Sequence, residues 1–136
     1  MKALPAGICL SLAACVAAPE VAEENADPDL VGEWRIAGID GNALDMPVGL
    51  ALSIDADIIE YPSGCGGHAW RYRVEGHTMS TTPTRTPDMD CLARSTFPRE
   101  VFTAAAAIDA AERIERTPEN GMRLFGGGRS LTIFSQ

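Results

Sequence analysis

Lysine is almost absent from the 136-residue chain, since Lys2 is the only one and the other basic residues are arginines. The 11 basic residues are outnumbered by 19 acids, which gives a net charge of −8. Nucleic-acid binding requires clustered cationic side chains, so this balance argues against a nucleic-acid partner. No apolar run approaches the roughly 20 residues that a membrane-spanning helix needs. Because 46 % of the residues are apolar, full disorder is also excluded, and the length suits one domain.

Motifs of the common enzyme classes are missing as well. The sequence has two histidines, no Gly-x-Ser-x-Gly elbow and no Gly-x-x-x-x-Gly-Lys loop. The run Gly126-Gly127-Gly128 precedes neither a lysine nor a helical pattern, so it indicates a hairpin turn rather than a phosphate-binding loop. We therefore expect a protein that is not an enzyme and that holds no cofactor or metal.

The first 14 residues have the pattern of an export signal. A short cationic start at Lys2 is followed by a mostly apolar run of signal-peptide length. The segment ends in Leu12-Ala13-Ala14-Cys15, which resembles the lipobox of bacterial lipoproteins. That resemblance implies removal of residues 1–14 and acylation of Cys15, which would anchor the chain to a membrane. An ordinary signal peptide, cleaved after a nearby small-x-small site, is the alternative.

Residues 15–29 are expected to form an acylated cysteine and an acidic tether. From Val16 to Asp29 there are five acids, two prolines and no base, a composition that cannot bury enough apolar surface to fold by itself. A flexible coil of this length reaches about 20 Å on average. Since Val16 and not an aspartate follows Cys15, we expect a lipid-anchored, periplasm-facing protein of the cell envelope, with the outer membrane favoured.

Residues 30–136 are predicted to form a mainly β domain of the α+β class. Apolar and polar residues alternate around Trp34, from Leu50 to Ile54 and from His68 to Val74, which is typical of antiparallel strands with one buried face. Between Phe97 and Ala111 an alanine-rich run with an early proline predicts a helix of about three turns. We expect a small curved antiparallel sheet or partial barrel, with one helix inserted before the last strands.

Two groups of charged residues in this domain are open to a functional or a structural interpretation. Arg71 and Arg73 point to one wet face of a strand, where pairing with acids across the sheet is favoured over binding of an anionic partner. Asp55 and Asp57 indicate a turn at a strand end rather than a metal site.

Cys65 and Cys91 remain once Cys9 and Cys15 are assigned to the leader and the lipid anchor. In an exported domain of this size, two cysteines indicate a disulfide first. A Cys₂His₂ zinc site with His68 and His77, or a pair of unbonded thiols, are the alternatives. There is no Cys-x-x-Cys motif, and His68 shares a strand face with aromatic residues, so packing explains it better than metal binding.

The order of motifs from Leu30 to Phe134 resembles the META domain family, the HslJ-like group. The matching elements are Leu30-Val31-Gly32-Glu33-Trp34, Ile39-Asp40-Gly41, Ser63-Gly64-Cys65, Trp70 with Tyr72, a Thr-rich segment ending at Cys91, Glu100 with Phe102, and the closing strands at Leu124 and Leu131–Phe134. The resemblance also implies pairing of Cys65 with Cys91. Two departures stand out: Gly66 replaces the family's asparagine, and the stretch between Thr86 and Cys91 is longer than usual.

The resemblance implies a non-enzymatic envelope module related to stress responses or to protein interactions, with an envelope protein as partner. Small exported β-barrel inhibitors of bacterial metalloproteases offer an alternative, since they also begin with a Gly-x-Trp strand and carry one disulfide. Their inhibition uses a free N-terminal segment, which an acylated Cys15 would obstruct.

Overall fold

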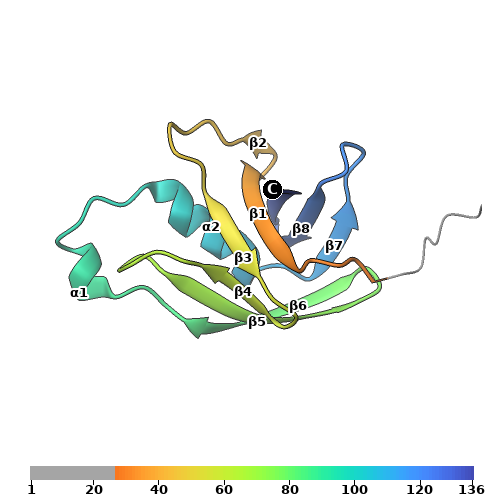
Figure 1. Cartoon of the computed structure of the whole chain (residues 1–136), viewed down its shortest axis with the longest axis horizontal. Helices are drawn as coiled ribbons and strands as arrows, with labels where there is room; N and C mark the ends of the chain where they lie inside the picture. Colours follow the sequence, from red (N-terminus) through yellow and green to blue (C-terminus); the bar gives the residue numbers. More distant parts are fainter. Residues whose placement is uncertain (1–26) are drawn as a thin grey trace, which may run out of the picture.

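The structure, a computed structural model, describes residues 27–136. In this part of the chain nine strands and two helices follow one another, with the second helix between the sixth and seventh strands (Figure 1). Their bounds are β1 Gly32–Ile39, β2 Asn42–Ala43, β3 Ala51–Ile54, β4 Ile58–Tyr61, β5 His68–Glu75, β6 Thr78–Arg85, α1 Met89–Leu92, α2 Arg99–Asp109, β7 Arg113–Arg116, β8 Met122–Gly126 and β9 Arg129–Ser135.

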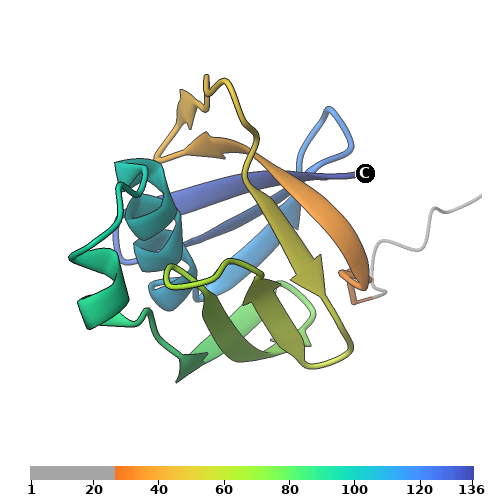
Figure 2. The same cartoon turned by 60° about the vertical axis from the view of Figure 1, so that its left-hand side comes forward.

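The sheet closes on itself, because β1 pairs with β3 on one side and with β9 on the other. At the closing seam Ile36 lies opposite Ile133, and the register shifts between Ile36 and Gly38. Of the nine described strands, only β2 lies outside the ring, so eight antiparallel strands form a closed barrel (Figure 2). The prediction of a mainly β fold is confirmed, but a curved sheet or partial barrel understates the closure, since β1 pairs directly with β9.

Large apolar side chains fill the barrel, as the two-residue alternation predicted. Trp34 and Ile36 of β1 and Leu52 and Ile54 of β3 are all buried, together with Trp70 of β5. Where these residues meet α2, the structure leaves a gap of only about 10 Å³, too small for any ligand.

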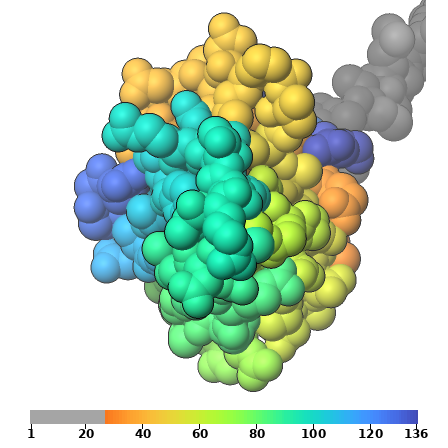
Figure 3. Space-filling view, turned by 90° about the vertical axis from the view of Figure 1, so that its left-hand side faces the viewer, coloured from red at the N-terminus to blue at the C-terminus, as the bar shows by residue number. Residues whose placement is uncertain are grey.

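Helix α2 covers one opening of the barrel and contacts β1, β6, β8 and β9. Its buried face consists of Val101, Ile108 and three alanines, whose small side chains let the helix approach the strands closely. Figure 3 shows α1 and α2 across this face of the molecule, and Figures 1 and 2 place both helices on the side opposite to the point where the chain enters at Asp27.

The predicted helix between Phe97 and Ala111 is confirmed with slightly shorter bounds. Pro98 has extended backbone angles and is the N-cap, so the helix begins at Arg99, and Glu100 lies in its first turn. The four-residue helix α1 was not predicted, because it has no apolar periodicity. Its N-cap is Asp88, whose Oδ1 accepts a hydrogen bond of 3.0 Å from the backbone N–H of Cys91.

Two tight hairpins join neighbouring strands, and the one at the triple-glycine run confirms the predicted turn. Strands β8 and β9 meet through Gly127 and Gly128, which both have positive φ angles, as a turn with mirror-image geometry requires. This places the triple-glycine run in a turn. Strands β5 and β6 meet through Gly76 and His77, with Glu75 opposite Thr78.

Asp40 fastens the closing seam of the barrel beside β2. Its Oδ1 accepts hydrogen bonds from the backbone N–H of Ser130 (3.0 Å) and from Nε of Arg129 (3.1 Å). Its Oδ2 lies 3.0 Å from a terminal nitrogen of Arg129. The Ser130 hydrogen bond and the Arg129 guanidinium lower the pKa of Asp40 below its ordinary 3.8, although desolvation partly opposes this shift.

This arrangement predicts a pH-dependent contribution to stability. Asp40→Asn is expected to lower the free energy of unfolding by about 1 kcal/mol at pH 7, because the ion pair is about one-third exposed. Because the folded-state pKa is lowered, the contribution is present above pH 3.8 and is lost as the pH falls through the folded-state value. Urea unfolding of variant and wild type at neutral and acidic pH measures the difference. The matched control is Asp45→Asn at an exposed position, and an unchanged Asp40→Asn deficit in acid would contradict the prediction.

Candidate functional site

The segment Asp27–Val31 leads the chain into β1 and lies against the barrel. Leu30 is only 1 % exposed, and its carbonyl oxygen accepts a 2.7 Å hydrogen bond from the indole N–H of Trp34. Asp29 Oδ1 accepts from the backbone N–H of Val31 at 3.0 Å, and Asp27 Oδ1 accepts from that of Gly76 at 2.5 Å. The last residues of the predicted tether are thus tied to the β5–β6 hairpin. Cys15, the predicted signal peptide 1–14 and residues 15–26 of the predicted tether lie outside the described residues.

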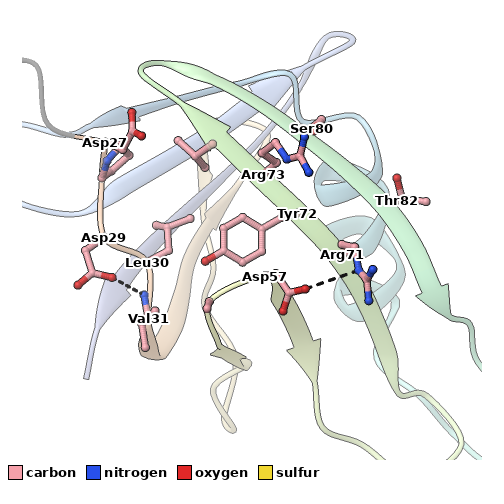
Figure 4. Close-up of a pocket in the computed structure, with 13 residues that line it drawn as sticks. Asp27, Asp29, Leu30, Val31, Asp57, Arg71, Tyr72, Arg73, Ser80 and Thr82 are labelled. Atoms are coloured by element: carbon pink, nitrogen blue, oxygen red, sulfur yellow. Dashed lines mark hydrogen bonds and ion pairs between the residues drawn. The ribbon is translucent and has the colours of Figure 1, made fainter.

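A groove of about 750 Å³ opens between this lead-in segment and the β5–β6 hairpin (Figure 4). Its volume lies within the range of small-molecule binding sites. The lining combines aspartates, arginines, hydroxyl groups and apolar side chains from the lead-in, the β3–β4 turn, β5 and β6: Asp27, Pro28, Asp29, Leu30, Val31, Ala56, Asp57, Arg71, Tyr72, Arg73, Val74, Ser80 and Thr82.

Arg71 and Arg73 form the cationic part of the groove. Both residues of β5 are exposed, and they lie opposite Thr82 and Ser80 of β6, so acids do not face them across this strand pair. Arg71 Nε lies 3.7 Å from Asp57 Oδ2 in the β3–β4 turn, with both side chains more than 60 % exposed, which makes the pair weak. Within residues 27–136, no carboxylate lies within 4.0 Å of the Arg73 guanidinium.

Tyr72 lies at the centre of the groove and points toward the lead-in (Figure 4). Its hydroxyl donates a 2.8 Å hydrogen bond to the carbonyl oxygen of Asp55. Burial raises the pKa of the phenol, and the charges of Asp29, Asp57 and Asp55 raise it further. Tyr72 therefore stays neutral at physiological pH. Asp55 and Asp57 lie at the β3–β4 turn, as the sequence predicted.

The two late cysteines lie together in an arrangement compatible with a disulfide. Their Cα atoms are 5.4 Å apart, inside the usual range for bonded cysteines. The backbone N–H of Asp88 donates to the carbonyl oxygen of Cys65 at 2.9 Å, which joins the start of α1 to the loop before β5. This pair lies at the helical side of the molecule, away from the groove.

The structure does not bring together the four residues of the zinc alternative. His68 begins β5 and His77 follows its end, so about 25 Å of strand separates the two histidines. His68 is buried, stacks on Trp70 with 5.4 Å between ring centroids and binds the carbonyl oxygen of Gly66 through Nδ1 at 2.7 Å. Across residues 27–136 the structure places no group of three or more His, Cys, Asp or Glu side chains around a common metal position.

Gly66 has a structural reason to be glycine. A Cβ atom at this position would lie 2.2 Å from Cε1 of Phe97, a distance that real side chains do not reach. The ring of Phe97 occupies the space that an asparagine side chain would need. The absence of a side chain at Gly66 is therefore coupled to the position of Phe97 in the loop before α2.

In the comparisons with known proteins, no family model, curated protein or solved structure matches the chain. Among the described helices, none has the length and apolarity to cross a membrane.

The groove itself was not predicted from the sequence. Of its charged lining, Arg71 and Arg73 were singled out beforehand as residues of a wet face and Asp57 as part of a turn, but nothing linked them to the lead-in. One feature of the sequence could have predicted the turn in the lead-in. Aspartates often accept a hydrogen bond from the backbone N–H two positions on, as Asp29 does from Val31.

Proposed function

We propose that this chain is a non-enzymatic, lipid-anchored protein of the bacterial cell envelope, acylated at Cys15, with a META-like interaction module in residues 30–136. The observation that carries the proposal is the position of the lead-in. The chain enters the barrel beside the groove and opposite α1 and α2 (Figure 1). A tether of about 20 Å from an acylated Cys15 would hold the groove side toward the membrane and leave the helical side free.

The disulfide-compatible pair supports an oxidising compartment. Disulfides persist in exported proteins and are rare in the reducing cytosol. Cys65 and Cys91 are both partly exposed, so the envelope redox machinery could reach them. A bond between them would fasten α1 to the barrel.

The residues that carry the META resemblance have structural roles in this barrel. Trp34 packs in the core and binds the lead-in, Asp40 fastens the seam, and Leu124 and Leu131 are fully buried. Their roles explain why such a motif set would specify a fold without specifying a reaction. This supports a module whose activity is binding, with an envelope protein as the expected partner.

Inhibition of a metalloprotease is the second candidate, and the closed barrel favours it because those inhibitors are small barrels. They act through a free N-terminal segment, whereas here Asp27 is tied to Gly76. Titration of the purified protein against secreted metalloproteases distinguishes the candidates. Stoichiometric inhibition at micromolar concentration would replace the anchored module with an inhibitor.

Incorporation of labelled palmitate tests the anchor directly. Wild-type protein expressed in a Gram-negative host is expected to carry label and to fractionate with the outer membrane. Cys15→Ala is expected to lose the label completely, because the thioether-linked lipid has no other attachment point. Cys9→Ala is the matched control in the same leader and should keep it. An unlabelled wild type, or label that persists in Cys15→Ala, would contradict the proposal.

A further inference from the structure

The two walls of the groove carry opposite charges. Figure 4 shows Asp27 and Asp29 along the lead-in on one side, and Arg73 with Ser80 on the β5–β6 side. Tyr72 lies between the two walls and, with the other apolar side chains of the lining, separates them. The groove is therefore bipolar rather than uniformly charged.

The charge balance of the lining selects among ligand classes. Three aspartates and two arginines give a net charge of −1, and the chain as a whole is strongly acidic. A simple anion would be repelled by this surplus, and a simple cation would leave Arg73 without a partner. A ligand with both a positive and a negative group satisfies both walls.

Both the aspartates of the lead-in and the arginine wall of the groove keep free hydrogen-bonding capacity. Asp27 and Asp29 each use one oxygen to accept from a backbone N–H, so their other oxygens remain available for an ammonium group. On the opposite wall, Arg73 and the neighbouring Ser80 hydroxyl both donate. The non-bridging oxygens of a phosphate can accept from a guanidinium and a hydroxyl at once.

We propose that this groove binds a phosphate ester bearing an ammonium group, the chemistry of a phosphoethanolamine headgroup. Arg73 and Ser80 bind the phosphate, and Asp27 and Asp29 bind the ammonium. A membrane phospholipid is one source of this group and a soluble ester is another. Delivery of a lipid headgroup to the groove rests on the proposed acylation of Cys15, whereas recognition of the group itself does not.

Binding to soluble probes tests the recognition. Titration calorimetry of the whole chain carrying Cys15→Ala, so that no lipid is attached, would compare O-phosphoethanolamine with inorganic phosphate, ethanolamine and phosphocholine. We expect phosphoethanolamine to bind at least about tenfold more tightly than each of the others, because only it offers a phosphate and an ammonium with N–H donors. Equal affinity for inorganic phosphate would overturn the proposal.

Three variants assign the effect to the groove. Arg73→Gln and Asp29→Asn are each expected to weaken phosphoethanolamine binding by about tenfold. Asp29→Asn retains an oxygen to accept from Val31, so the lead-in turn is kept while the charge is removed. Arg94→Gln removes an exposed arginine outside the groove and should leave binding unchanged. Equal losses in all three variants, or none in the first two, would contradict the assignment.

Vesicle sedimentation then identifies the source. The same unacylated chain is expected to sediment with vesicles of phosphatidylethanolamine and phosphatidylcholine but not with phosphatidylcholine alone, and Arg73→Gln should abolish this difference. Soluble binding without sedimentation would support recognition and assign the ligand to a free ester. Because these measurements use unacylated protein, a chain that takes up no palmitate but binds the headgroup would overturn the anchor alone.

Discussion

Trp70→Ala is expected to lower the free energy of unfolding by about 3–5 kcal/mol, the usual cost of removing a large buried aromatic side chain. Trp70 is 1 % exposed, packs beneath α2 and stacks on His68. Its indole N–H also donates a 2.7 Å hydrogen bond to Oδ1 of Asp109 at the end of α2. Since a domain of this size has only about 5–15 kcal/mol in total, a large fraction of the variant would unfold on mild heating.

A second variant at this position separates packing from hydrogen bonding, and an exposed position provides the control. Trp70→Phe keeps an aromatic ring but removes the indole N–H, so the part of its deficit due to the hydrogen bond should be about 1 kcal/mol. Val48→Ala, at a side chain that is 75 % exposed, should stay within about 0.5 kcal/mol of the wild type. Urea unfolding measures all three. A deficit below about 1 kcal/mol for Trp70→Ala would mean that this side chain is outside the core.

Replacing both Cys65 and Cys91 with serine is expected to cost about 3.5 kcal/mol, provided that the pair is bonded in the exported protein. A cross-link between positions 26 apart removes conformational entropy from the unfolded chain by about this amount. Replacing both residues leaves no lone thiol to form a wrong pairing, so the comparison measures the cross-link.

Reductant provides the control for the cysteine pair. Adding it to the wild type should lower the urea midpoint to that of the double variant, while the double variant itself should not respond. A wild type whose midpoint is the same with and without reductant would contradict the disulfide and leave two neighbouring thiols in its place.

The sequence predicted β1, β3 and β5 because burial on one face leaves a two-residue period, whereas the short strands β2 and β4 were not predicted. Trp34 and Ile36, or Leu52 and Ile54, are buried in the structure as their alternation indicated. Closure of the barrel could not be predicted in this way. The seam joins Ile36 to Ile133 across almost the whole domain, and alternation identifies which side chains face inward without identifying which strand lies alongside.

The two helices differed in how well the local sequence predicted them. The proline-led, alanine-rich pattern was long enough to predict α2, whereas α1 has only four residues and depends on the cap from Asp88. The groove could not be predicted from local sequence, because its residues come from four separate segments: the lead-in, the β3–β4 turn, β5 and β6. Arg71 and Arg73 are conspicuous in the sequence. Asp27 and Asp29 were assigned to the tether because they end an acidic, proline-containing segment.

Mass analysis of the native protein, extracted from cell envelopes under non-reducing conditions, tests the central claim most directly. The account predicts a chain that begins at Cys15, carries covalent fatty acyl groups there and lacks two hydrogens because Cys65 and Cys91 are joined. A chain that still begins at Met1, without lipid and with both late cysteines open to alkylation, would contradict it.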